Sequence, residues 1–312
     1  MLLVTGSAGH LGEALLRTLR GSARPCVGLD RIASPFTDVV GSIADPAICE
    51  RAMAGCDQVI HAATLHKPHV ASHSRQAFVD TNVTGTLNLL EAAVRANVRA
   101  FIFTSTTSVF GDALVPPPGA PTAWITEEVT PVAKNIYGVT KLAAEDLCAL
   151  AHRNQGLTCL VLRTSRFFPE ADDDPQARAT YTDENLKATE YLYRRVDLED
   201  AVDAHLVALD RAAALGFGRF IITATTPFER GDAGELRRDP EAVLTRRVPG
   251  WRDAYRALGW KLLPAFDRVY DNTRARDLLG WRPKHAFGSV LARGGDVKSP
   301  LARAIGSKGY GN

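Results

Sequence analysis

Tyr137 and Lys141 stand four residues apart in a stretch whose apolar side chains recur at helical spacing, so both would lie on one face of a helix. A lysine ammonium beside a tyrosine hydroxyl stabilises the phenolate and lowers the pKa of the phenol from its usual value of about 10. Such a phenol takes a proton from an alcohol during oxidation and returns it during reduction. Upstream, residues 104–108 are all Thr or Ser, and one of these hydroxyls could hydrogen-bond the reacting oxygen.

Three glycines form a second motif between a predicted strand and a predicted helix. Gly6, Gly9 and Gly12 would let the chain turn tightly and approach a pyrophosphate, which the free N–H groups of the helix N-terminus attract. Asp30 ends the next predicted strand, where a carboxylate accepts hydrogen bonds from ribose hydroxyls and repels a 2′-phosphate. The pattern predicts NAD rather than NADP, although the adjacent Arg31 would offset part of that repulsion. The cofactor-binding residues of the turn are predicted to be Gly6, Ala8, Gly9, His10, Leu11 and Gly12.

These residues need a framework of alternating strands and helices. Apolar, β-branched runs predict strands at residues 2–5, 25–30, 58–61, 100–104 and 158–163. Helical periodicity predicts helices at 11–20, 46–54, 75–96 and 137–155. Strand–helix alternation predicts an α/β fold with a Rossmann-type, doubly wound parallel sheet, which binds ligands at the carboxyl ends of its strands.

The alternation fades after residue 164, and this change predicts a smaller C-terminal substrate lobe. We expect the NAD-binding domain to comprise residues 1–164, with 195–224 returning to it. The lobe would comprise residues 165–194 and 225–290. Residues 291–312 are rich in Gly, Ser and Lys toward their end, which predicts a poorly ordered tail.

Composition excludes several classes of protein. A net charge of +2 over 312 residues, without a dense basic stripe, excludes a nucleic-acid binder. We expect no membrane helix, because no run of eighteen uncharged apolar residues occurs, and no signal peptide, because the chain opens on a strand. The five cysteines form no CxxC pair, so we expect reduced thiols, no zinc site and a cytoplasmic protein.

Taken together, the motifs resemble the extended short-chain dehydrogenase/reductases, in particular the NAD-dependent epimerase/dehydratase family that includes UDP-galactose 4-epimerase. The resemblance covers about residues 2–285. Besides the motifs above, it rests on Val59-Ile60-His61-Ala62-Ala63, on Asn82 within Thr81–Leu90, on Leu162-Arg163 and on Leu279-Gly280-Trp281-Arg282-Pro283.

The resemblance implies roles for individual residues. Thr106 would be the catalytic Ser/Thr, Tyr137 the base and Lys141 its partner, with Tyr137 and Lys141 also touching the cofactor. Ala62 and Ala63 would line the cofactor, and Asn82 would support its site. The family also implies a homodimer formed by the helices at 75–96 and 137–155, unless their apolar stripes pack on the sheet alone.

Substrate recognition is where the chain departs from the family pattern. The usual R-x-x-N-x-Y-G-P motif reads Arg163 to Pro169 here, so Arg166 replaces an asparagine and would either clamp a substrate carboxylate or phosphate, or pair with the acidic loop at 172–174. Arg268 would bind a substrate diphosphate or form a surface ion pair. In the loop 64–73, His66 would contact substrate, whereas Pro68 and the lack of a nearby carboxylate disfavour a metal site.

The leading prediction is an NAD-dependent epimerase of a sugar or nucleotide sugar that acts by transient oxidation of a secondary alcohol. Thr107 follows Thr106 where 4,6-dehydratases carry Asp-Glu, so elimination of water is disfavoured. The alternative is a dehydrogenase or reductase of a sugar, a uronate or another secondary alcohol with net turnover of NAD(P). A non-catalytic NAD sensor is a third reading, which the intact Thr106, Tyr137 and Lys141 disfavour.

Overall fold

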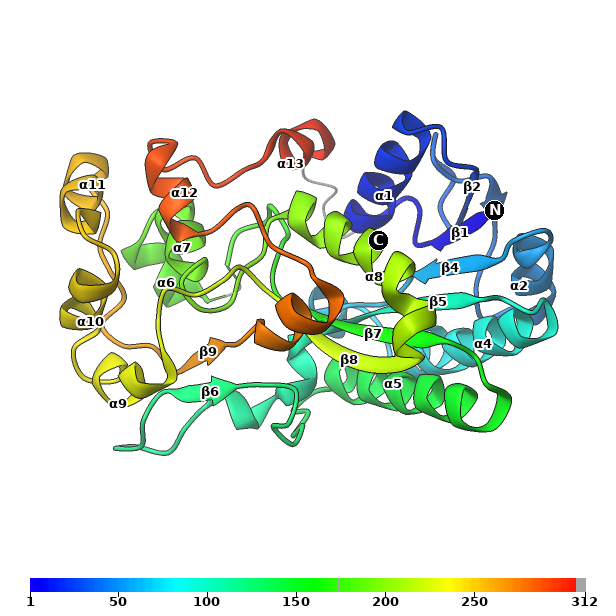
Figure 1. Cartoon of the computed structure of the whole chain (residues 1–312), viewed down its shortest axis with the longest axis horizontal. Helices are drawn as coiled ribbons and strands as arrows, with labels where there is room; N and C mark the ends of the chain where they lie inside the picture. Colours follow the sequence, from blue (N-terminus) through cyan, green and yellow to red (C-terminus); the bar gives the residue numbers. More distant parts are fainter. Residues whose placement is uncertain (173, 307–312) are drawn as a thin grey trace.

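The computed structural model describes residues 1–172 and 174–306. Within them, a seven-stranded parallel sheet runs in the order β3-β2-β1-β4-β5-β7-β8 (Figure 1). The order reverses direction beside β1, which is the switch point where doubly wound sheets bind ligands. The strands are β1 (Leu2–Thr5), β2 (Cys26–Asp30), β3 (Val39–Val40), β4 (Gln58–His61), β5 (Ala100–Thr106), β7 (Cys159–Thr164) and β8 (Phe217–Ile222).

Helices cover both faces of the sheet, because alternate strand residues point to opposite sides and both sets are apolar. Ile102 faces the helices α1 and α8, whereas Phe101 and Phe103 face α2, α4 and α5. The first layer contains α1 (His10–Gly21), α8 (Leu198–Leu215) and α13 (Pro300–Ile305). The second contains α2 (Pro46–Met53), α4 (Gly85–Arg95) and α5 (Ile136–Gln155). This arrangement confirms the predicted Rossmann-type class.

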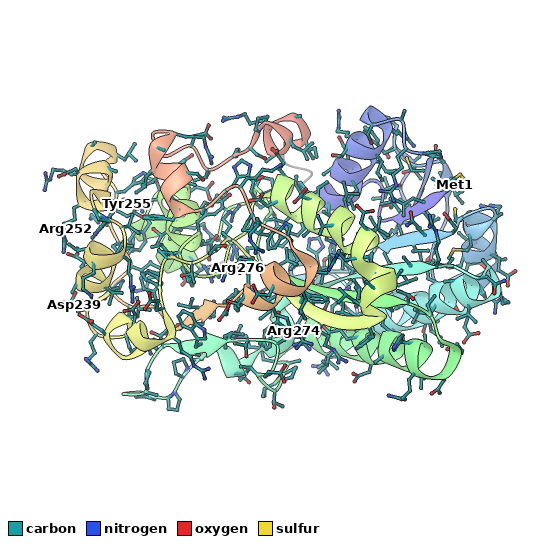
Figure 2. All side chains as sticks on the ribbon, viewed as in Figure 1. Met1, Asp239, Arg252, Tyr255, Arg274 and Arg276 are labelled. Atoms are coloured by element: carbon teal, nitrogen blue, oxygen red, sulfur yellow. The ribbon has the colours of Figure 1, made fainter. Side chains whose placement is uncertain are left out.

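A smaller lobe lies at the end of the molecule away from the N-terminus. Figure 2 shows Asp239, Arg252 and Tyr255 in this lobe, far from Met1. Its own core includes Trp251, Phe266 and Phe287. Its helices are α6 (Pro175–Thr180), α7 (Asp183–Glu190), α9 (Ala233–Leu236), α10 (Pro240–Arg247), α11 (Trp251–Leu258) and α12 (Phe287–Ala292). A two-stranded sheet, β6 (Ala123–Ile125) with β9 (Arg268–Tyr270), adjoins these helices.

Three sequence expectations differ from the structure. The predicted helix 75–96 is divided into α3 (Arg75–Phe78), a π-helical segment (Val79–Thr84) and α4. The strand β6 falls within the range assigned to the NAD-binding domain but pairs with β9 of the lobe. The tail expected to be poorly ordered contains α13, whose Ser299 cap and buried Ile305 attach it to α1 and α8. Residues 307–312 of that tail lie outside the described residues.

Among the described residues, no helix has both the length and the apolar character that a membrane crossing requires.

Candidate active site

Thr106 and Tyr137 meet at the carboxyl edge of the sheet. Thr106 is the last residue of β5, and Tyr137 lies in the first turn of α5, which begins where the Asn135 side chain caps the Gly138 N–H. Burial raises the pKa of Tyr137 to about 12, and a hydrogen bond with Thr106 lowers it in part. The two hydroxyls that the sequence analysis singled out therefore lie within hydrogen-bonding reach of each other.

Lys141 lies one helical turn after Tyr137 and is almost wholly buried. Its Nζ donates to the Thr104 carbonyl at 2.6 Å and lies 4.0 Å from the centre of the Phe103 ring. Burial lowers the pKa of Lys141 to about 7, although Cys148 and Glu145 raise it. The expectation that Lys141 depresses the pKa of the phenol differs from this structure, where burial dominates and Thr106 supplies the lowering contribution.

The glycine turn between β1 and α1 is built from close backbone approaches. Gly6 has a φ of +76°, and a Cβ there would meet the Ala63 nitrogen at 2.8 Å. At Gly12 a Cβ would lie 1.9 Å from the Gly6 carbonyl oxygen, so no larger residue fits. Gly9 caps α1 without any side-chain hydrogen bond, which leaves the first-turn N–H groups for a ligand phosphate.

Asp30 and the ends of β1 and β4 complete the nucleotide-binding edge. One oxygen of Asp30 accepts from the Ala8 N–H at 3.0 Å and the other from the Ile32 N–H at 2.9 Å, so the carboxylate is fixed beside the glycine turn. Arg31 is exposed, and the Ala63 N–H donates to the Thr5 hydroxyl. These residues fit a dinucleotide: an uncapped helix N-terminus for the pyrophosphate and a carboxylate for the adenosine ribose.

Asn82 lies in the π-helical segment, and its side chain hydrogen-bonds only to other protein groups among the described residues. Its Oδ1 accepts from the Thr64 hydroxyl and the Leu65 N–H, and its Nδ2 donates to the Leu65 carbonyl and the Thr140 hydroxyl, all within 3.0 Å. These four bonds use the full capacity of the amide. Asn82 thus joins the loop after β4 to α5, and it supports the site rather than reaching into it.

The histidine loop follows β4 and faces the same edge. The rings of His66 and His69 lie 4.3 Å apart, and His66 stacks on Phe168 at 6.0 Å. Burial, followed by the nearby His69, His10 and Lys141, lowers the pKa of His66 to about 3. His66 is therefore a neutral imidazole at physiological pH, suited to exchange hydrogen bonds with an uncharged hydroxyl.

Arg166 belongs to a cluster of charges that the sequence analysis identified only in part. Its guanidinium lies 3.1 Å from Asp172 and 3.4 Å from Glu190, which also pairs with Arg194 and Arg195. Burial alone would raise the pKa of Glu190, but Arg194, Arg166 and Arg195 lower it to about 2. Three guanidiniums thus share two carboxylates. The sequence feature that could have predicted this cluster is the spacing of Glu190 and Arg194, which stand one helical turn apart.

Arg268 is the first residue of β9 and lies near Tyr193. Its Nε is buried without a hydrogen-bond partner among the described residues. The charges of Arg194, Arg268 and Arg166 all lower the pKa of Tyr193, which burial raises. The two arginines predicted to bind substrate therefore both lie close enough to Tyr193 to influence its hydroxyl.

A contact between His10 and Glu170 joins the start of α1 to the loop after β7, and it is an ion pair only when the imidazole is protonated. The His10 Nε2 at the start of α1 lies 3.4 Å from Glu170 in the loop after β7. The sequence carried no signal for this contact, because 160 positions separate the residues.

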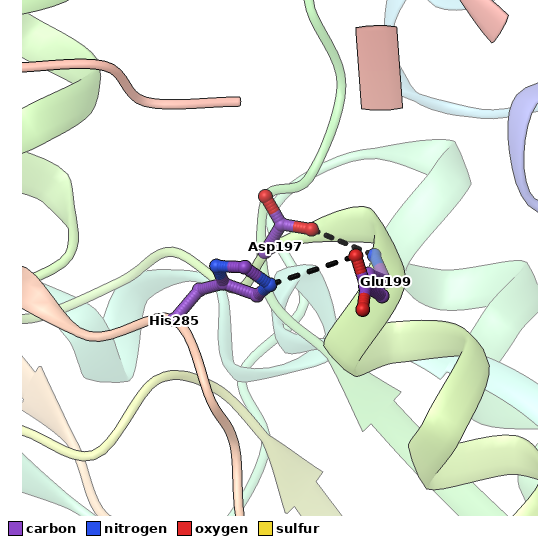
Figure 3. A group of neighbouring side chains, drawn as sticks. All are labelled: Asp197, Glu199 and His285. Atoms are coloured by element: carbon purple, nitrogen blue, oxygen red, sulfur yellow. Dashed lines mark hydrogen bonds and ion pairs between the residues drawn. The ribbon is translucent and has the colours of Figure 1, made fainter. Parts of the chain in front are cut away.

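The described residues contain one His/carboxylate group of metal-binding composition: Asp197, Glu199 and His285 (Figure 3). Asp197 caps α8 by accepting from the Glu199 N–H at 2.7 Å, and it also accepts from the Ser299 N–H. The His285 Nε2 faces Glu199 at 3.7 Å, and its Nδ1 faces Arg293 at 3.2 Å. Because Asp197 is engaged and a guanidinium adjoins the imidazole, these contacts describe a clamp that holds the C-terminal segment to α8.

Comparison with known proteins places this geometry in a family. Residues 2–222 match the model of the NAD dependent epimerase/dehydratase family. A dTDP-glucose 4,6-dehydratase of Streptomyces niveus is 36% identical over 190 residues, so that match spans about half of each chain (54%). A UDP-glucose 4-epimerase of Azospirillum brasilense is 26% identical over 99% of this chain and 94% of its own. Among solved structures, a short-chain dehydrogenase/reductase superfamily protein of Agrobacterium tumefaciens with bound NAD superposes with a TM-score of 0.68, at 25% identity over 97% of both chains.

Proposed function

Because the chain belongs to the NAD-dependent epimerase/dehydratase family and is an NAD-dependent enzyme, we propose that it is an epimerase of a nucleotide sugar. The observation that carries the proposal is the convergence of Thr106, Tyr137 and Lys141 at the edge of the sheet that holds the glycine turn. Relatives named as nucleotide-sugar epimerases match nearly the whole chain and support the substrate class.

The chemistry requires an alcohol to lose a proton and a hydride and to regain both. NAD, when bound, accepts and returns the hydride. Thr106 positions the reacting hydroxyl, and Tyr137 takes its proton. Burial raises the pKa of Tyr137 to about 12, and the hydrogen bond with Thr106 lowers it in part, so Thr106 also helps Tyr137 to take the proton. Lys141, one helical turn after Tyr137, donates from its ammonium to the Thr104 carbonyl and would contact the cofactor.

Elimination of water is not supported by the residues after Thr106. A sugar dehydratase would need a further acid and base to remove a hydroxyl and a carbon-bound proton. Thr107 and Ser108 offer hydroxyls at this point instead of carboxylates. Epimerisation requires no such groups, because the oxidised sugar rotates in the site and is reduced on its other face.

Arg166 and Arg268 would bind the anionic part of the substrate, and His66 a sugar hydroxyl. Arg166 already pairs with Asp172 and Glu190. An anionic substrate group would therefore become a further partner of a guanidinium that these carboxylates hold in place. The neutral His66 stacks against Phe168, the aromatic residue two positions beyond Arg166.

A net dehydrogenase is the second candidate, and Arg166 is the observation that favours it. A guanidinium in place of asparagine suits a substrate carboxylate, as in a uronate. Such an enzyme would use the same Thr106, Tyr137 and Lys141 and would release NADH after each turnover.

The two candidates are separated by incubating the purified protein with UDP-glucose and, in parallel, with UDP-glucuronate. An epimerase converts either sugar to its 4-epimer, followed by NMR, while retaining NAD and accumulating no NADH. Stoichiometric NADH formation with either substrate would refute the epimerase and support the dehydrogenase.

We also propose that two copies of the chain associate through α4 and α5. These helices lie side by side on one face (Figure 1) and expose Leu87, Val139 and Leu150. A charged substitution, Val139→Glu, should give a monomer in light scattering, whereas Val115→Glu, at an apolar residue exposed elsewhere, should not. An unchanged mass for Val139→Glu would exclude this surface.

A further inference from the structure

Glu145 continues the face of α5 that carries Tyr137 and Lys141, one further turn along the helix. It is fully buried, and the proposed chemistry makes no use of it. A buried carboxylate is costly unless it is paired and hydrogen-bonded, so its partners are informative.

Those partners lie on three adjacent strands of the sheet. The Ser105 hydroxyl on β5 donates to Glu145 Oε1 at 2.6 Å, and Arg163 on β7 donates to both carboxylate oxygens, at 2.8 Å from its Nη2 to Oε2. Ser105 and Arg163 are direct register partners in the sheet. Arg219 on β8 adds a third donor at 3.1 Å. A single side chain thus fastens α5 to three consecutive strands.

The strand residue that Glu145 holds lies between two residues of the active site. The carbonyl of Thr104 accepts the hydrogen bond from Lys141, and the hydroxyl of Thr106 bonds Tyr137. A shift of Ser105 toward or away from α5 would therefore move both contacts together. On the other side, the Arg163 guanidinium lies 5.0 Å from the centre of the Phe110 ring, at the end of the segment that follows Thr106.

We propose that Glu145 is the positioning residue of this active site: by holding Ser105 and Arg163 it fixes the end of β5 against α5, and with it Thr106 and the acceptor of Lys141. The inference rests on the proposed roles of Thr106, Tyr137 and Lys141. Catalytic side chains keep a productive geometry only when the residues that contact them are themselves held in place by packing and hydrogen bonds.

The negative charge of Glu145 also affects the pKa of Lys141. The groups that face Lys141 are Glu145 and Cys148 on its own helix, His61 on β4 and His66 in the following loop. Of these, Glu145 and Cys148 raise the pKa of Lys141 against the lowering effect of burial. Removing the Glu145 carboxylate should therefore shift the titration of Lys141 to lower pH.

The first test is Ser105→Ala, which removes the link to β5 and leaves the Glu145–Arg163 ion pair intact. We expect hydrogen exchange of the segment 104–111 to accelerate about tenfold, the loss expected for one hydrogen bond to a charged acceptor. The matched control is Ser299→Ala, another buried serine, which caps α13. Unchanged exchange in Ser105→Ala, or equal acceleration of this segment in the control, would overturn the proposal.

The second test separates positioning from stability. Glu145→Gln alone leaves Arg163 buried without its counter-ion and should unfold at lower temperature. The double variant Glu145→Leu/Arg163→Met removes both charges and the acceptor of Ser105, and it should recover most of the melting temperature. A purely structural role predicts that it also recovers slow exchange at 104–111, whereas the proposal predicts that exchange stays fast.

The third measurement is NAD affinity as a function of pH, by titration calorimetry. Affinity should fall as Lys141 loses its proton, at a pH of about 7 in the unmodified protein and at lower pH in Glu145→Gln, which removes only the carboxylate charge. Lys141→Met identifies that transition, because it should abolish it. If the unmodified protein shows no such transition, the proposed role of Lys141 fails, and the exchange measurements alone decide the role of Glu145. A transition that does not move in Glu145→Gln contradicts the influence of Glu145 on Lys141.

Discussion

The two halves of the candidate site are built by different physical means. On the nucleotide side, the contacts come from backbone: Gly6 and Gly12 bring main-chain atoms together, and the uncapped start of α1 presents N–H groups. On the lobe side, they come from charge: Arg166, Arg194 and Arg195 surround Glu190. The half proposed to hold NAD therefore depends on geometry that tolerates few residue types, whereas the half proposed to hold the substrate depends on charged side chains.

This difference also predicts how each side responds to change. A substitution in the backbone-built half should have a large effect, because no neighbouring residue can restore the space that a new side chain fills. A substitution in the charge-built half should have a smaller effect, because several arginines share each carboxylate and the remaining arginines still pair with it.

The largest effect is expected for Tyr137→Phe, on the nucleotide side. Losing the phenolic proton carrier should lower kcat about a hundred- to ten-thousand-fold, while NAD binding persists. Tyr255→Phe is the matched control, since Tyr255 is also a buried tyrosine with a threonine partner, Thr189, but lies in the lobe. Steady-state kinetics of both variants settles the point: a Tyr137→Phe enzyme as active as the unmodified one would remove Tyr137 from the mechanism.

Gly12→Ala should weaken NAD binding about a hundredfold. The new Cβ would overlap the Gly6 carbonyl, displacing the turn and costing one or two charge-assisted hydrogen bonds of the phosphates. Gly21→Ala, in the last turn of the same helix, adds a Cβ that meets nothing within 4 Å and should leave the affinity unchanged. Calorimetric titration with NAD compares the two, and equal affinities would show that the turn does not hold the cofactor.

On the lobe side, Glu190→Gln should lower stability by about 3 kcal/mol at neutral pH, because three guanidiniums lose a buried counter-charge. The folded-state pKa of Glu190, about 2, lies below that of the unfolded chain, so its contribution is complete above a pH of about 4.5 and is lost as the pH falls toward 2. The variant should therefore lose less stability over that interval. Chemical denaturation at several pH values measures both effects.

The control for this experiment is Glu241→Gln, which breaks an exposed ion pair with Arg252 and should change stability by no more than about 0.5 kcal/mol. Parallel pH profiles for the unmodified protein and Glu190→Gln would show that the cluster is not what makes the lobe sensitive to acid.

Arg166→Asn should have the smallest effect of the series. It restores the residue usual in the family and leaves Arg194 and Arg195 on Glu190. We expect KM for UDP-glucuronate to rise about tenfold with little change in kcat, as for a lost charge contact to bound substrate. Arg252→Asn, on the surface of the lobe, should change neither constant. An unaltered KM would confine Arg166 to the internal charge network.

Sequence patterns predicted the nucleotide side closely because its determinants are local. Strand β1, the glycine turn and α1 are consecutive, and Tyr137 and Lys141 are neighbours on one helix. Apolar periodicity missed the π-helical segment around Asn82, because the inserted residue changes the helix geometry without changing the composition. It also missed the pairing of β6 with β9, which joins segments more than a hundred residues apart.

By itself, the sequence predicted the Rossmann-type sheet, the glycine turn and the helical pair Tyr137 and Lys141 from short-range spacing, and the family resemblance added the role proposed for Thr106. Only the tertiary structure shows that Glu145 hydrogen-bonds to three strands and that Arg166 shares Asp172 and Glu190 with its neighbours. It also shows that burial dominates the pKa values of Tyr137 and Lys141. Contacts between distant segments and the loss of water around a charge exist only once the chain has folded, so no local pattern records them.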